Sequence, residues 1–147
     1  MEIIYYNISD DDIPHIAEME LKYFGQPWSE TGIRRYVEEG NMIFIVAKDK
    51  DMIAGYCAVL KAYDEGDLVS IAVDEDHRRT GIARELLDIA CEMAQEQGIE
   101  TIHLEVRGSN EAAIGLYESE GFVRSGLRKG FYSNPKEDAL LYLKKLK

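Results

Sequence analysis

The chain has 147 residues, of which 46% are hydrophobic and 31% are charged. This length and composition suit a single globular domain over residues 1–147 and exclude an intrinsically disordered chain. With 17 Lys and Arg against 28 Asp and Glu, the formal net charge is -11. So acidic a chain disfavours nucleic-acid binding, which requires a basic surface. The negative charge would suit a basic partner, and solubility alone is the simpler explanation.

The first half of the chain is predicted to begin with a strand over Glu2–Ile8, which is rich in Ile and Tyr. The acidic segment Asp10–Asp12 can cap a helix that runs to about Phe24. Pro14 is compatible with that helix only in its first turn. Residues 1–12 lack the basic region and the long apolar region of a signal peptide, and no apolar run is long enough to span a membrane. We therefore expect a cytoplasmic protein with no membrane partner.

A short second helix and a hairpin are expected next. Ser29 is a candidate N-cap for a helix that runs through Val37. The apolar runs Met42–Lys48 and Met52–Ala62 flank a polar turn and predict a β-hairpin. Asp67–Val73 is a further apolar run and predicts a central strand.

The second half of the chain shows clear helical and strand periodicities. Apolar residues recur at helical spacing from Gly81 to about Gln97, and Gly98 can end that helix. Thr101–Arg107 alternates strictly, so that Ile, Leu and Val face one side and polar residues face the other. A helix with Ser109 or Asn110 as its N-cap and Gly121 at its C-terminal end follows. Two closing strands are expected over residues 122–132 and 138–146.

These elements amount to about seven strands and four helices in an interleaved order that includes hairpins. Such an order predicts a mixed sheet in an α/β domain. The cysteines Cys57 and Cys91 are isolated and are expected to be buried thiols. The three histidines are too far apart in sequence for a local metal motif, so no metal site is expected.

A basic turn interrupts the acidic sequence at DEDHRRTGIAREL, Asp74 to Leu86. It follows a predicted strand and leads into the longest predicted helix, and unpaired N–H groups at a helix N-terminus bind anions. Gly81 would let a phosphate approach the backbone closely, and the arginines beside it add positive charge. The turn matches neither the P-loop nor the dinucleotide fingerprint. From the residues alone, a capping turn with exposed arginines is an equal alternative.

The segment Arg78–Ala83 resembles the (Arg/Gln)-x-x-Gly-x-(Gly/Ala) signature of the GNAT superfamily of N-acetyltransferases. The stretch LEVRGSNEAAIGLYESEGF, Leu104 to Phe122, is similar to the corresponding stretch of the RimI-type ribosomal-protein-alanine N-acetyltransferases. The resemblance covers nearly the whole chain and implies the GNAT-like α+β fold, with a mixed, mostly antiparallel sheet. It also implies acetyl-CoA as the donor and a protein N-terminal amine as the acceptor, in this branch the N-terminal alanine of a small-subunit ribosomal protein.

The resemblance further implies roles for individual residues. Glu105 matches the family's general base and Tyr117 its general acid. The pantetheine arm would pair with a strand, and the pyrophosphate would lie on the basic turn and the start of the helix. The implied donor-binding residues are Ile71, Ala72, Val73, Arg79, Thr80, Gly81, Ile82, Ala83, Arg84 and Asn110.

Each of these residues also has a structural interpretation. Glu105 could be a solvated carboxylate on the polar face of a strand, Tyr117 a core residue, and Asn110 a helix N-cap. Phe131 and Tyr142 depart from the RimI-type pattern where substrate recognition is expected, and a peptide groove would lie near Trp28 and Tyr132. The alternatives to N-terminal acetylation of the ribosomal protein are a small-molecule amine, another protein's N-terminus, or a non-catalytic acyl-CoA-binding module.

Overall fold

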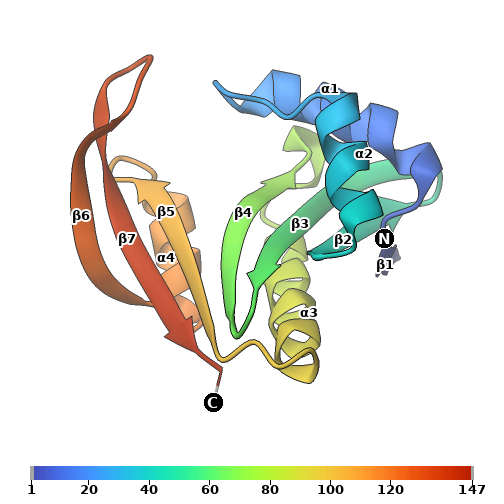
Figure 1. Cartoon of the computed structure of the whole chain (residues 1–147). Helices are drawn as coiled ribbons and strands as arrows, with labels where there is room; N and C mark the ends of the chain where they lie inside the picture. Colours follow the sequence, from blue (N-terminus) through green and yellow to red (C-terminus); the bar gives the residue numbers. More distant parts are fainter. Residues whose placement is uncertain (1, 147) are drawn as a thin grey trace.

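The computed structural model describes residues 2–146 of the chain. These residues form one sheet in the order β1-β2-β3-β4-β5-β7-β6 (Figure 1). All neighbouring strands are antiparallel except β4 and β5, which are parallel. The predicted fold class, a mixed and mostly antiparallel sheet of seven strands with four helices, is confirmed for the described residues. The strands are β1 Ile3–Asn7, β2 Met42–Asp49, β3 Met52–Ala62, β4 Glu65–Val73, β5 Thr101–Arg107, β6 Val123–Tyr132 and β7 Glu137–Lys145.

The helices cover both faces of the sheet and bury a separate apolar cluster on each. Alternation along β2 divides its side chains: Ile43 and Ile45 pack in the cluster under α3, whereas Phe44 and Val46 pack under α1 and α2. The helices are α1 Ile13–Tyr23, α2 Glu30–Glu39, α3 Ile82–Glu96 and α4 Glu111–Ser119, with short 3-10 turns at Asp10–Asp12 and Glu75–His77.

Most of the predicted helix ends are confirmed by the hydrogen bonds that cap them. The Ser29 side chain accepts from the N–H of Gly32, and the Asn110 side chain accepts from the N–H of Ala113. Gly98 and Gly121 both have positive φ just after a helix. Pro14 lies in the first turn of α1, as predicted.

Two predictions about local structure are wrong. Strand β4 begins at Glu65 rather than Asp67, because its first residues pair with the end of β3. The acidic side chains before α1 also do not cap that helix. Asp12 stands at its N-cap position, but its carboxylate instead accepts hydrogen bonds from the backbone and hydroxyl of Ser9 and from the Tyr6 hydroxyl.

Candidate functional site

The sheet opens between its two parallel strands. β4 and β5 pair only at Glu65–Thr101, Gly66–Ile102 and Asp67–His103, and the two strands then diverge in a V (Figure 1). The divergence coincides with a register shift in the β3–β4 pairing, where Val69 has no partner on β3.

The residues of β4 beyond the shift have one free edge. Ile71, Ala72 and Val73 pair with Cys57, Tyr56 and Gly55 of β3 on one side and with no strand on the other. An exposed strand edge is a template for an extended ligand, which can add to the sheet through backbone hydrogen bonds. This geometry fits the predicted placement of the pantetheine arm. One carbonyl is already engaged, because Val73 O accepts from Arg78 Nε at 3.1 Å.

The loop between β4 and α3 exposes its backbone N–H groups. Arg79 has φ 64° and Gly81 φ 85°, so the chain enters the left-handed region twice before α3 begins. Within residues 2–146, the N–H groups of residues 79–84 have no hydrogen-bond acceptor, and the first intrahelical bond runs from Glu85 N to Gly81 O. Successive free N–H groups at a helix N-terminus form a concave anion site. The loop therefore fits the pyrophosphate that the sequence predicts there.

The buried side chain of His77 anchors the β4–α3 loop to the end of β2. The residue is 7% exposed, and its ring lies between two carboxylates, with Nε2 3.0 Å from Asp49 Oδ2 and Nδ1 3.1 Å from Asp74 Oδ2. The Thr80 hydroxyl donates to the carbonyl of His77 at 2.5 Å. These contacts tie the anion loop to β2. Sequence reasoning treated His77 only as part of the basic turn; the acidic residues around it in DEDH were the available signal.

Hydrogen bonds to Asp49 and then to Asp74 raise the pKa of His77 above its usual value. The protonated form is thus favoured in the folded state, and its stabilisation is fully present below the unfolded pKa of about 6.5. We expect this contribution to the free energy of unfolding to disappear as the pH rises through the higher folded pKa. Urea titrations between pH 5.5 and 8.5 should show this loss in the wild type and a smaller one in His77→Gln. His15→Gln, at an exposed histidine that forms no ion pair or side-chain hydrogen bond within residues 2–146, is the control, and an equal slope in wild type and His77→Gln would contradict the prediction.

The arginines of the turn are less available than the sequence suggests. The Arg84 guanidinium forms an ion pair with Glu120 at the end of α4, and Arg78 lies over the Tyr23 ring at 4.9 Å. Two of the arginines expected to add positive charge beside Gly81 are therefore held by other side chains of the protein. Among residues 2–146, Arg79 forms no ion pair or hydrogen bond. It remains free to contact an anion, and Arg84 can contribute its backbone N–H.

The proposed base and acid come from the other side of the opening. Glu105 lies on β5, two residues beyond the last pairing with β4, and its side chain points away from the apolar face of the strand. Its carboxylate is 39% exposed and lies 3.9 Å from Arg128 of β6. Burial, and next the charge of Glu105, raise the pKa of Tyr132, so this phenol stays protonated.

Tyr117 has a buried ring and an accessible hydroxyl. The residue is 6% exposed and packs on Phe122, with ring centroids 5.8 Å apart. The Tyr117 hydroxyl forms no hydrogen bond within residues 2–146. Every fully buried side-chain oxygen in this range does have a hydrogen-bond partner. The Tyr117 hydroxyl is therefore not fully buried and is in contact with solvent. Burial is the main cause that raises the pKa of Tyr117, and smaller effects come from Cys57 and Tyr132. The core and the site interpretations of Tyr117 are therefore compatible.

An arginine that sequence reasoning did not select holds the β6–β7 turn beside the opening. Arg107 donates to the carbonyls of Ser133 and Pro135, and its guanidinium lies 4.4 Å from the centre of the Tyr132 ring. These contacts fix Tyr132 relative to β5. The partners of Arg107 are 26 and 28 residues away in sequence, so no local pattern indicates them.

The remaining residues that the sequence analysis singled out lie in different surroundings. Asn110 caps α4, as its structural interpretation requires, and Phe131 is exposed on β6. Tyr142 does not lie at a recognition surface: it is buried in the cluster shared with α3, and its hydroxyl donates to Glu118 at 2.7 Å. The expectation for Tyr142 is therefore wrong. Cys57 and Cys91 are buried free thiols, as predicted.

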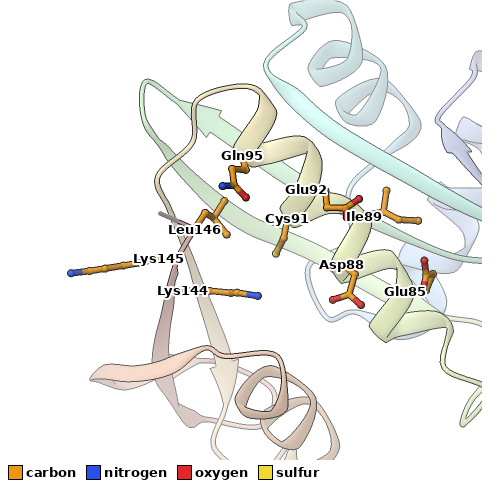
Figure 2. A pocket seen from close by; sticks show the side chains of 9 residues that line it. All are labelled: Glu85, Asp88, Ile89, Cys91, Glu92, Gln95, Lys144, Lys145 and Leu146. Atoms are coloured by element: carbon orange, nitrogen blue, oxygen red, sulfur yellow. The ribbon is translucent and has the colours of Figure 1, made fainter.

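A hollow of about 430 Å³ lies elsewhere, between α3 and the end of β7 (Figure 2). In Figure 2, Lys144 extends toward Asp88 of α3, whereas Lys145 points away. The hydrogen bond of Asp88 to Glu120, with burial and the charge of Glu120, raises the pKa of Asp88 to about 6. None of the predicted site residues lines this hollow. Its lining residues are Glu85, Asp88, Ile89, Cys91, Glu92, Gln95, Lys144, Lys145 and Leu146.

Residues 2–146 contain neither a membrane-spanning helix nor a cluster of metal ligands. No helix in this range is long and apolar enough to cross a membrane. No group of three or more His, Cys, Asp and Glu side chains in the same range could hold a metal ion.

Comparison with known proteins shows the family to which the chain belongs. The Acetyltransferase (GNAT) family model matches residues 13–122, and the chain belongs to this family of acyl-transferring enzymes. The family uses acetyl-CoA. The chain is 34% identical over 137 residues, 92% of each chain, to the [ribosomal protein bS18]-alanine N-acetyltransferase of Escherichia coli (strain K12).

Two further proteins extend the similarity. The putative [ribosomal protein bS18]-alanine N-acetyltransferase of Bacillus subtilis (strain 168) is 32% identical over 136 residues, which span 92% of this chain and 90% of the relative. The crystal structure of the ribosomal-protein-S18-alanine N-acetyltransferase from Escherichia coli superposes with a TM-score of 0.90 at 29% identity. That match covers 99% of this chain and 95% of the other. The resemblance to the RimI-type branch is therefore confirmed.

Proposed function

We propose that the protein transfers the acetyl group of acetyl-CoA to a protein N-terminal α-amine, namely the N-terminal alanine of ribosomal protein bS18. The observation that carries this proposal is the 34% identity, over 92% of both chains, to an enzyme named for that reaction. The net charge of -11 is also suited to a basic ribosomal acceptor.

The free edge of β4 and the loop at the start of α3 are proposed to hold the donor. Backbone groups of Ile71, Ala72 and Val73 bind the extended arm, and the N–H groups of residues 79–84 bind the pyrophosphate. Acetyl-CoA, when bound there, supplies the thioester that the acceptor amine attacks. The Asn110 side chain lies at the N-terminus of α4, on the same side of the opening as Tyr117.

Glu105 and Tyr117 are proposed to handle the two protons of the reaction. A protein N-terminal amine has a pKa of about 7.7–8.0, so much of it is protonated at neutral pH. Glu105 accepts a proton from this ammonium group, directly or through one water, and so frees the nitrogen lone pair that then forms the C–N bond. Backbone N–H groups of β4 stabilise the negative charge that develops on the carbonyl oxygen. The accessible hydroxyl of Tyr117 donates a proton to the sulfur as the C–S bond breaks.

An acetyl-transfer assay on peptides with the bS18 N-terminal sequence tests the acceptor. We expect kcat/KM for the Ala-starting peptide to exceed that for Gly- and Val-starting variants by about 10-fold or more, since one methylene in a fitted pocket is worth that much. The measurement is thiol release, with mass spectrometry of the peptide. Equal rates on all N-termini would point to another protein N-terminus as the acceptor. Transfer only to small amines would indicate a small-molecule acetyltransferase, and CoA binding without turnover would indicate a non-catalytic acyl-CoA-binding module.

A further inference from the structure

A buried carboxylate on α1 has no role in the chemistry described so far. Glu20 is 3% exposed and takes part in no ion pair within residues 2–146. It accepts three hydrogen bonds, from the Tyr56 hydroxyl at 2.5 Å, the Ser70 hydroxyl at 2.8 Å and the backbone N–H of Trp28 at 3.1 Å. Burial, followed by the charge of Glu20, raises the pKa of Tyr56, so its phenol stays protonated and donates.

Such a group is costly to retain for stability alone. A buried carboxylate without a cation loses its hydration, and replacing buried polar groups by apolar ones of similar shape is often neutral or stabilising. The three donors around Glu20 do satisfy it, because no buried side-chain oxygen of the described residues lacks a partner. What the carboxylate provides beyond an apolar side chain is a fixed geometry among those donors.

The three groups that donate hydrogen bonds to Glu20 come from different elements and connect the α1–α2 segment to β4, the strand on which acetyl-CoA binding is proposed. Trp28 belongs to the segment between α1 and α2, Tyr56 to β3 and Ser70 to β4. Ser70 faces α1 because the register shift at Val69 exchanges the faces of β4, and it immediately precedes Ile71. The Glu20 carboxylate therefore links the Trp28 backbone to the strand on which donor binding is proposed.

The α1–α2 segment is well placed to contact an acceptor. It and the β6–β7 turn lie on the two sides of the opening between β4 and β5 (Figure 1). The Trp28 ring packs on Tyr36 and Phe44, with centroid distances of 5.6 and 6.4 Å. The backbone N–H of Trp28 donates to Glu20, and Glu20 in turn accepts from Tyr56 of β3 and Ser70 of β4. Within residues 2–146, this is the hydrogen-bonded link between the Trp28 backbone and the sheet.

We propose that Glu20 is a positioning residue, which fixes the α1–α2 segment relative to β4 and so sets where the acceptor N-terminus lies. This inference rests on the proposed function, since it assumes a peptide acceptor in the opening. The proposed role requires that the side chain at position 20 has an oxygen that accepts a hydrogen bond; it does not require a negative charge. A glutamine can serve, because its oxygen can accept from the Trp28 N–H while the two hydroxyls turn to accept from its NH₂ group.

Three variants test the proposal by kinetics. Glu20→Met keeps the length of the side chain and removes its acceptor atoms, so we expect KM for the peptide to rise about 10-fold or more, with KM for acetyl-CoA within about 2-fold of wild type. Glu20→Gln should restore the wild-type KM for the peptide. Tyr56→Phe removes the hydrogen bond from the Tyr56 hydroxyl to Glu20 and leaves the one from the Trp28 N–H. It should therefore lower Tm without raising KM for the peptide. A wild-type KM for the peptide in Glu20→Met, or equal rises in all three variants, would overturn the proposal.

Two readouts do not depend on activity. Trp28 is the single tryptophan of the chain, so acrylamide quenching of its fluorescence reports this segment alone. Quenching should increase in Glu20→Met and not in Tyr56→Phe. In the wild type, hydrogen exchange of the Trp28 amide should be much slower than that of Gly25 and Gln26, and this comparison decides the matter if Glu20→Met does not fold. Fast exchange at Trp28 overturns the inference, whereas a wild type that acetylates no peptide overturns the proposed function instead.

Discussion

Glu105→Gln is expected to lower kcat by about 10²–10⁴ at pH 7, the usual contribution of a positioned general base. The carboxamide keeps the size of the side chain but cannot accept the proton of the acceptor amine. Glu105 lies on β5 beyond its pairing with β4, and its carboxylate is partly exposed. KM for acetyl-CoA should stay within about 2-fold, because the proposed donor site is built from β4 and α3.

The pH dependence separates a catalytic from a structural role for Glu105. Above the amine pKa of about 7.7–8.0 the acceptor is already neutral, so less depends on the base. The ratio of wild-type to variant kcat/KM should therefore fall as the pH rises from 6.5 to 9. Glu92→Gln, at an exposed carboxylate on α3, is the matched control and should behave as wild type. A pH-independent ratio, or full activity at pH 7, would remove Glu105 as the base.

The elements that the sequence predicts well are those whose signals are local. Ser29 and Asn110 each cap a helix through a backbone N–H three residues further on. The alternation of Thr101–Arg107 places Glu105 on the polar face of β5 because side chains of a strand point to opposite faces in turn. The fold class followed from such signals together with the family resemblance.

The opening between the strands could not be predicted in this way. The run Asp67–Val73 reads as a uniform apolar strand, whereas the divergence depends on the missing partner of Val69 and on pairing that ends at His103. A register shift is decided by the neighbouring strands, so no residue type within the run indicates it.

The partners of the site residues were equally hidden, because they are far apart in sequence. Arg84 pairs with Glu120 and Tyr142 with Glu118, at separations of 36 and 24 residues. The basic turn therefore offers an anion fewer free guanidinium groups than its sequence suggests. Its free backbone N–H groups are the larger part of the proposed anion site.

Because backbone groups dominate the proposed anion site, Gly81→Asp is the sharpest test of donor binding. Gly81 has φ 85° and open space where a Cβ would lie, and Asp tolerates the left-handed region better than most residues. The variant should therefore fold, and an acidic residue at the start of a helix is favourable for the helix. Its carboxylate would, however, face a bound pyrophosphate. Two like charges about 4 Å apart near a protein surface cost about 4 kcal/mol, or roughly 10³-fold in affinity for CoA.

Gly98→Asp is the matched control for this prediction, because Gly98 has the same φ of 85° and the same open surroundings but lies after the other end of α3. It introduces the same strain and the same charge away from the proposed anion site. Calorimetric titration with CoA should therefore show a loss of affinity in Gly81→Asp and wild-type affinity in Gly98→Asp. Equal affinity in both variants would mean that the pyrophosphate lies elsewhere. Equal loss in both would mean that net charge or backbone strain, and not the free N–H groups of residues 79–84, controls binding.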